Sequence, residues 1–220
     1  MEKAFQDLDD WLAVEKMPNG KKRVLQAAIT LFSKQGYNGT STAQIAELSK
    51  MSQATIFKYF KSKDDLLLFI VTPMIKHILP GYGKSFAQKL RDNGDDLTSF
   101  IHFIVFNRYQ FLVQNKDAAI ILISQLLIND EIKNMLFNEI QTMKDIFIDN
   151  VWQPLVATGE LRDDLDLLQF LRTVIGQILL YFLQSQRVLQ IDDQKQIESD
   201  LNKIEHTIIL AIKNSSICQV

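Results

Sequence analysis

The chain contains the run Thr55-Ile56-Phe57-Lys58-Tyr59-Phe60-Lys61-Ser62-Lys63, in which three aromatic and three lysine side chains are interleaved. Ser52 lies just before it, and serine is a preferred residue at a helix start because its hydroxyl accepts a free backbone N–H. Ile56 and Phe60 are one helical turn apart, so they share one face. The run therefore predicts a short helix over residues 53–60, anchored by these two apolar side chains. Four side chains are left to point outward: Gln53, Ala54, Phe57 and Lys58.

Two helices are expected before this one. A helix over residues 21–35 is predicted because apolar side chains recur along one face. They are Val24, Ala27, Ala28, Leu31 and Phe32. Gly36 follows, at a position where helices often end in the left-handed conformation. Ser41 opens the second helix with Gln44 three residues later, which is the spacing of a capping box. We expect Ile45, Ala46 and Leu48 to face inward.

Residues 49–52 are expected to form a tight turn between the second helix and the helix over residues 53–60. Ser62 is placed to cap a fourth helix that continues to about Ile78. Asp64 and Asp65 lie in its first turn, where negative charge is favourable to the helix dipole. Two short helices joined by a tight turn are typical of a helix-turn-helix, which lays its second helix in the major groove of DNA.

The distribution of charge supports a polyanion as the partner of this segment. The whole chain has a net charge of −2. Residues 21–77, however, hold nine Lys or Arg and three acidic residues, whereas the segments on either side are acidic. A basic segment on an acidic body is the electrostatic footprint of nucleic-acid binding.

The segment Lys22–Leu67 resembles the N-terminal DNA-binding domain of TetR-family transcriptional regulators. The spacing of the matching residues holds without a gap over about a fifth of the chain. The matching pieces are Leu25-Gln26-Ala27-Ala28, Leu31-Phe32, Gly36-Tyr37, Thr40-Ser41, Ile45-Ala46, Ser52, Thr55 to Phe60, Ser62-Lys63 and Leu66. Three positions depart from the family pattern. Lys50 stands where members usually have glycine in the turn, Phe57 replaces a tyrosine, and Ala43 stands where many members have a basic residue.

The outward side chains suggest how DNA would be read. Gln53 is the best base reader, since its amide can pair bidentately with adenine, and Ala54 and Phe57 can contact a thymine methyl group. Hydroxyl, phenol and ammonium groups near the helix ends suit phosphate oxygens. This phosphate set is Ser41, Thr42, Ser52, Thr55, Lys58, Tyr59 and Lys63. Alternatives remain open: the serines can act only as caps, Tyr59 can be core, and the lysines can form a solvated face.

The rest of the chain is expected to be all-α. Helical patterns cover about 84–91, 96–115, 117–127, 130–151, 163–189 and 193–213. Pro80-Gly81-Tyr82-Gly83 is expected to break the chain between a DNA-binding domain and a body, and Pro154 and Gly159 to interrupt later. The expected organisation is an N-terminal arm over residues 1–20, a helix-turn-helix domain over 21–79 and a helical effector-binding and dimerisation domain over 80–220. The arm is expected to be either loosely held or a short helix docked on the body.

The last two helices predict a homodimer. The helix at 163–189 is apolar on almost every face and the helix at 193–213 has one apolar stripe, which is more than one protomer easily covers. Pairing with their copies as a four-helix bundle would bury both. The family resemblance implies the same arrangement, with two recognition helices presented to a palindromic operator.

Aromatic residues cluster at 96–115 and 130–151, and they are either ordinary core or the wall of an apolar effector cavity, as the family implies. The candidate ligand-binding residues are Phe103, Phe106, Asn107, Gln110, Phe147, Arg172, Gln177 and Tyr181. The expected function is a dimeric repressor released from operator DNA by a small apolar or amphipathic effector. The alternative is a ligand-independent DNA-binding protein with a solid core.

Other classes of protein are not favoured. Three histidines, one cysteine and no metal-spaced pair leave little from which to build an active site, so we expect no enzyme, cofactor or metal. The longest apolar run, Ile178–Leu183, is far shorter than the ~20 residues that cross a bilayer. No signal peptide is evident at the first residues. We therefore expect a cytoplasmic protein that does not use a membrane.

Overall fold

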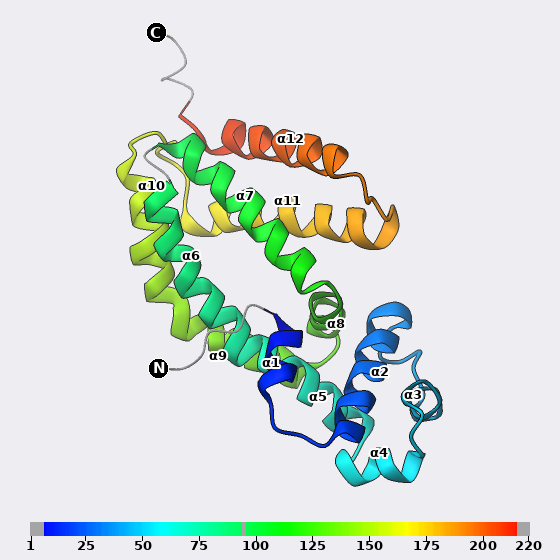
Figure 1. Ribbon diagram of the computed structural model, residues 1–220. Helices are drawn as coiled ribbons and strands as arrows, with labels where there is room; N and C mark the ends of the chain where they lie inside the picture. The colour runs from blue at the N-terminus through cyan, green and yellow to red at the C-terminus, as the bar shows by residue number, and fades with distance from the viewer. Residues whose placement is uncertain (1–6, 94–95, 215–220) are drawn as a thin grey trace. The chain divides into compact units, whose positions relative to one another are not determined.

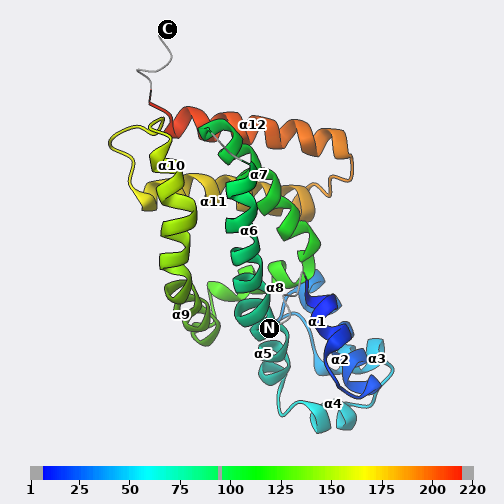
Figure 2. The same cartoon turned by 60° about the vertical axis from the view of Figure 1, so that its left-hand side comes forward.

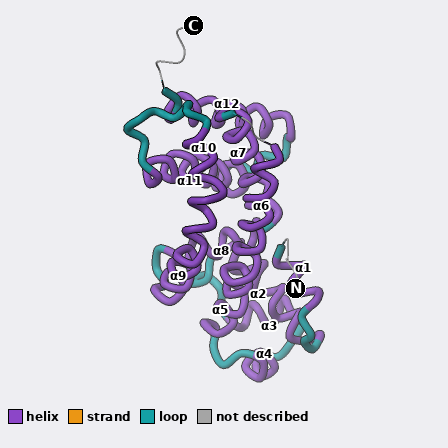
Figure 3. Tube along the Cα trace, turned by 90° about the vertical axis from the view of Figure 1, so that its left-hand side faces the viewer, coloured by secondary structure: helices purple, strands orange, loops and turns teal. Residues whose placement is uncertain are grey.

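The computed structural model describes residues 7–93 and 96–214, and its regular elements in this part of the chain are helices (Figures 1 and 3). The all-α fold predicted from the sequence is confirmed. The first five helices are α1 (Leu8–Val14), α2 (Asn19–Gln35), α3 (Thr42–Ser49), α4 (Gln53–Tyr59) and α5 (Lys63–Pro73). A π-helical turn, η1 (Met74–Ile78), leads from α5 into α6 (Leu79–Asn93).

The later elements follow the predicted order. They are α7 (Leu97–Gln114), α8 (Lys116–Leu126), α9 (Asp130–Phe147), the π-helical turn η2 (Ile148–Trp152), α10 (Gln153–Ala157), α11 (Leu167–Leu183), the π-helical turn η3 (Gln184–Val188) and α12 (Gln194–Ile212).

The described chain forms two compact units. Of the described residues, unit 1 comprises 7–82 and 115–142, and unit 2 comprises 83–93, 96–114 and 143–214. This grouping differs from the predicted division at residue 80, because α8 packs on α2 and α5 and so belongs to unit 1. The helix-turn-helix lies entirely in unit 1, and the two C-terminal helices lie entirely in unit 2.

Unit 1 has a core built from the inward faces of its helices. Val24, Leu25 and Ala28 of α2 are fully buried, as is Ile45 of α3. The N-terminal arm contributes as well, since α1 is capped by Asp7 and buries Leu8 and Leu12. A short docked helix is therefore observed, but its aromatic contact is with Phe69 of α5 in the DNA-binding domain and not with the body.

Unit 2 is centred on α7, α11 and α12, which pack on one another (Figure 2). A buried network joins α7 to η3: the Tyr109 hydroxyl lies 3.0 Å from Ser185 Oγ and accepts a hydrogen bond from Gln186 Nε2 at 3.1 Å. Ser185 is completely buried. Tyr109 also packs its ring against that of Tyr181, with centroids 5.3 Å apart. These contacts fix the α7–α11 interface.

Glu160 holds together three separate parts of unit 2. Its Oε1 accepts the backbone N–H of Leu97 at 2.9 Å, at the start of α7. Its Oε2 lies 3.0 Å from Lys213 Nζ, just past the end of α12. The hydrogen bond from Leu97, aided by the ion pair with Lys213, holds the pKa of Glu160 below its usual range. The carboxylate is therefore part of the fold at neutral pH.

Two predicted helix breaks are wrong. The helix continues through Pro80-Gly81-Tyr82-Gly83, and α10 continues past Pro154 to Ala157. In each case a π-helical turn ends two residues before the proline. A π turn is wider than an α turn, so the proline ring does not have to fit beneath a carbonyl at α-helical spacing. Gly159 does end its helical segment, with a φ of 68°.

Three smaller expectations also need correction. Leu48 is half exposed rather than inward, because the buried face of α3 is formed by Ile45, Ala46 and Ser49. The helix expected from residue 163 begins at Leu167, because Asp166 caps it in a second capping box. Gly36 has the positive φ that favours glycine, but its ψ of 160° is extended and not left-handed helical.

Candidate nucleic-acid interface and effector region

The helix α4 is built by local hydrogen bonds. Ser52 Oγ accepts the backbone N–H of Thr55 at 3.1 Å and so caps its start. The N–H of Phe60 donates to the carbonyl of Ile56 at 2.9 Å and closes its end. Ile56 and Phe60 are buried, which confirms the predicted inward face. The short helix is thus anchored on one side and free on the other.

The turn before α4 is formed by a residue with a side chain. Lys50 adopts the left-handed helical conformation, with φ 54° and ψ 38°. Its N–H donates to the carbonyl of Glu47 at 3.1 Å, and the N–H of Met51 donates to the carbonyl of Ala46 at 3.0 Å. The turn is therefore well satisfied, although a β-carbon at such a φ is disfavoured by sterics.

The predicted base-facing residues are open to solvent. Gln53, Ala54 and Lys58 are exposed, and Phe57 keeps 47% of its surface accessible although it is a large apolar side chain. An isolated chain gains nothing by exposing Phe57. The outer face of α4 therefore combines an amide, a cation and apolar surface, which are the groups needed to read base edges.

The predicted phosphate contacts differ in how free they are. Ser41 and Ser52 are exposed, but both act as helix caps. Ser41 Oγ accepts the N–H of Gln44 at 3.2 Å, while the Gln44 side chain accepts the N–H of Ser41 at 2.9 Å, so the predicted capping box is confirmed. Thr42 and Thr55 are half-buried. Their hydroxyls lie at helix starts, where backbone N–H groups also favour an anion.

Lys63 is tied into the fold. Its ammonium donates to the carbonyls of Tyr37 at 3.0 Å and Thr40 at 2.9 Å, and it lies 4.2 Å from the centroid of the Tyr37 ring. An ammonium has three donors. These bonds therefore leave one N–H of Lys63 for a phosphate.

Sequence reasoning missed the loop that Lys63 secures. Thr40 is buried and its hydroxyl donates to the Gly36 carbonyl at 2.8 Å, while the Tyr37 hydroxyl donates to Asp64 at the start of α5. Burial, together with the bond to Asp64, raises the pKa of Tyr37 above its usual value, so it stays a donor. Lys63 and Asp64 are more than twenty residues from their partners Tyr37 and Thr40 in the sequence, and no local pattern indicates these bonds.

Tyr59 is half-buried, and its hydroxyl faces the start of α2. A β-carbon placed on Gly20 would lie 2.8 Å from Tyr59 Oη. A side chain at position 20 would have to displace the end of the Tyr59 ring, so Tyr59 is at once a packing residue and a candidate phosphate contact.

The predicted effector residues, which all belong to unit 2, are not gathered around one cavity. Phe103, Phe106, Asn107 and Phe147 are half-buried, and Tyr181 is buried. Gln110, Arg172 and Gln177 are exposed in the single chain, so they do not line an enclosed space. The rings of Phe103 and Phe86 stack with centroids 5.4 Å apart, and Phe106 lies against His102. A missed residue, Arg108, places its guanidinium 3.7 Å from the centre of the Phe86 ring.

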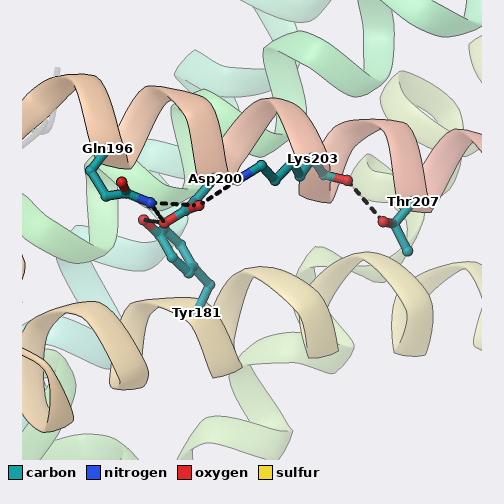
Figure 4. Close-up of polar contacts among 5 residues, drawn as sticks. All are labelled: Tyr181, Gln196, Asp200, Lys203 and Thr207. Carbon is teal, nitrogen blue, oxygen red and sulfur yellow. Dashed lines mark hydrogen bonds and ion pairs between the residues drawn. The ribbon is translucent and has the colours of Figure 1, made fainter.

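A groove of about 400 Å³ lies between α11 and α12. Gln177 and Tyr181 are among its lining residues, as are the exposed Leu180 and Leu189. On one side the Asp200 carboxylate accepts hydrogen bonds from Tyr181 Oη at 3.2 Å and from Gln196 Nε2, and lies 3.3 Å from Lys203 Nζ (Figure 4). The Gln196 and Lys203 bonds lower the pKa of Asp200, so it is anionic at neutral pH.

Within residues 7–93 and 96–214, no group of three or more His, Cys, Asp or Glu side chains is placed to hold a metal ion. By length and composition alone, the helical segment Leu167–Val188 could cross a bilayer, with a mean hydropathy of 1.3. Core helices of soluble proteins pass the same test.

A helix-turn-helix with an exposed recognition helix, in an otherwise all-α chain, defines a DNA-binding transcriptional regulator. Residues 24–70 match the family of bacterial regulatory proteins known as the tetR family. Over this segment the chain carries the DNA-binding domain of TetR-family regulators.

Relatives extend the likeness beyond the helix-turn-helix. The uncharacterized HTH-type transcriptional regulator YvkB of Bacillus subtilis is 25% identical over 89% of this chain and 96% of its own length. The fatty acid degradation regulator FadR of Bacillus halodurans has the same fold, with a TM-score of 0.59, 15% identity and coverage of 89% and 97% of the two chains. The FadR of Bacillus subtilis, solved in complex with stearoyl-CoA, matches with a TM-score of 0.54, 16% identity and coverage of 85% and 96%.

Proposed function

We propose that the chain is a homodimeric repressor that binds a palindromic operator through α3 and α4 and leaves it when a small amphipathic molecule binds unit 2. The observation that carries the proposal is the outer face of α4. Its base-facing residues are exposed, whereas Ile56 and Phe60 anchor it from below.

The DNA contacts follow from this face. Gln53 reads a base edge, Ala54 and Phe57 contact thymine methyl groups, and Lys58 neutralises a phosphate. Ser41, Thr42, Ser52, Thr55 and Tyr59 position the backbone, and the remaining N–H of Lys63 supports them. Lys50, exposed in the turn, is added to the predicted set because a phosphate near the turn would meet it.

The dimer is supported by apolar surface on α11. The segment Leu167–Val188 contains an apolar stretch of 18 residues, of which only 28% is buried within the chain. Leu168 and Leu180 are each 68% exposed and Ile175 is also exposed, as is Leu189 just past η3. Monomeric proteins seldom leave such an apolar helix face in water. Packing α11 and α12 against their copies would cover it and would place two recognition helices on one DNA duplex.

An effector is supported by two observations. Unit 2 holds aromatic side chains that are only half-buried, and Arg108 and Asn107 lie among them. A relative of the same fold was solved with stearoyl-CoA, an amphipathic acyl ligand. An effector can release DNA only if it binds the DNA-free geometry of the dimer more tightly.

Selection of duplexes from a random-sequence pool would test the DNA-binding proposal. We expect a palindromic consensus and a steep dependence of affinity on salt. Gln53→Ala is expected to weaken the selected duplex by about 1–3 kcal/mol at one base pair of each half-site, with little change on scrambled DNA. An equal loss on both duplexes would show that Gln53 does not read a base.

The effector can be tested on the same complex. Titration with stearoyl-CoA, stearate and a library of apolar compounds is expected to release the labelled duplex with at least one of them. The exposure of Gln110, Arg172 and Gln177 favours the alternative of a ligand-independent regulator. Retention of the duplex throughout the library, with no thermal stabilisation of the protein, would favour that alternative.

A further inference from the structure

The N-terminal helix α1 is packed into the DNA-binding unit by more than its two leucines. Trp11, half-buried on α1, presents its ring to Phe69 of α5, with centroids 5.9 Å apart in an edge-to-face arrangement. Phe69 in turn meets Phe60, which ends α4, with centroids 5.5 Å apart. A line of aromatic contacts therefore joins the arm to the end of the recognition helix.

Lys21 occupies the centre of this aromatic group. Its ammonium lies 4.0 Å from the centroid of Phe69 and 5.0 Å from that of Phe60. Both distances are within the range of a cation–π interaction. By sequence Lys21 belongs to the basic segment that suggests phosphate binding, but in the structure its charge is directed at two rings.

The recognition helix has few anchors of its own. α4 has seven residues, and within it only Ile56 is fully buried. Phe60 is the second anchor, and the neighbouring Tyr59 is held against Gly20 at the start of α2. The end of α4 is thus fixed by residues 20 and 21 and by the ring that Trp11 supports.

We propose that α1 is a positioning element for the recognition helix: Trp11 and Lys21 fix the end of α4 through Phe69 and Phe60, and Lys21 does not contact the DNA backbone. The inference rests on the proposed operator binding and adds the arm to it. It assigns Trp11 and Lys21 a role in specificity without contact with DNA.

The test uses the full chain and two labelled duplexes: the one that the wild-type protein selects from a random pool and a scrambled version. Binding is measured by fluorescence anisotropy across a salt series. Lys21→Met keeps the apolar stem and removes the charge. We expect affinity for the selected duplex to fall about two- to fivefold, as loss of a cation–π contact implies, with the salt slope unchanged. Lys58→Met, the matched control, lowers the slope by about one on both duplexes.

Trp11→Ala should reproduce the effect of Lys21→Met, and Trp11→Phe should restore wild-type binding because it keeps an aromatic edge on Phe69. Val14→Ala, at an exposed position of α1, should change nothing. A salt slope lowered by about one in Lys21→Met would place Lys21 on phosphate and overturn the proposal. Wild-type binding by Trp11→Ala would do the same. If the wild-type protein selects no duplex, the proposed operator binding itself fails.

Discussion

Units 1 and 2 are both helical, but the helix starts of the DNA-binding segment in unit 1 are held by local bonds, whereas the helices of unit 2 are joined by bonds between distant residues. In the DNA-binding segment of unit 1, the caps formed by Ser41, Ser52 and Ser62 join residues three apart. In unit 2, Tyr109 bonds to Ser185, His102 pairs with Glu205, and Glu160 reaches Leu97. Local bonds can be recognised in a sequence and long-range bonds cannot, so the helix caps of unit 1 could be predicted residue by residue, whereas the bonds made by Lys63 and the long-range bonds of unit 2 could not.

The largest effect on DNA affinity is expected from a substitution on the exposed apolar face of α11 in unit 2. Leu180→Glu places a charge on the exposed apolar face of α11 and should convert the proposed dimer to monomer. Operator affinity is then expected to fall roughly 10²–10⁴-fold, since the second half-site no longer adds to the first. Analytical ultracentrifugation and anisotropy would measure both changes. Leu127→Glu, at a more exposed leucine in unit 1, is the control and should leave both unchanged.

A dimer that persists in Leu180→Glu would mean that the apolar face of α11 is not the interface. Unit 2 would then have to form the dimer through another surface, or the protein would act as a monomer.

A smaller effect, on stability, is expected from Glu160, which bonds to distant parts of unit 2. Because its pKa is lowered on folding, Glu160 contributes stability that is complete above its unfolded pKa of about 4.3. This contribution is lost as the pH falls through the folded value. Glu160→Gln should cost about 1–2 kcal/mol at pH 7 and flatten the decline of stability below pH 5.

Urea denaturation at several pH values would measure the Glu160 effect. Glu198→Gln, at an exposed position of α12, serves as control. Parallel pH profiles for Glu160→Gln and the wild-type protein would contradict the assignment.

The smallest effect is expected from relief of backbone strain in unit 1. Lys50→Gly removes a β-carbon from a residue with a φ of 54° and should stabilise the protein by about 0.5–1 kcal/mol. Gln190→Gly makes the matched change in unit 2, at a φ of 52°. Urea denaturation would compare the two. Destabilisation by Lys50→Gly would show that its side chain contributes more than its conformation costs.

Several features of unit 1 could be predicted because they depend on near neighbours. The capping box of Ser41, the cap of Ser52 and the inward pair Ile56 and Phe60 all follow from spacing within one helical turn. The partners of Lys63 could not be predicted in this way. Its residue type suggested a phosphate contact, but the carbonyls that hold it come from a loop more than twenty residues earlier.

The sequence also predicted that the last two helices carry more apolar surface than one chain covers, because amphipathicity is a property of a single helix. It could not predict which side chains line a groove, since that depends on how α11 and α12 meet. Of eight predicted effector residues, Gln177 and Tyr181 line the groove between these helices. The docking of α1 was left open for the same reason, because Trp11 finds its partner on α5.

The two π-helical turns that precede Pro80 and Pro154 have a consequence for how this chain can change by insertion and deletion. A π turn holds one residue more than an α turn over the same span. Loss of a single residue from Met74–Ile78 or Ile148–Trp152 would let an ordinary α turn form, and the proline would then sit in a regular helix interior at a cost of about 3 kcal/mol. Each proline therefore preserves the extra residue before it, and a one-residue deletion there should be tolerated only together with replacement of the proline.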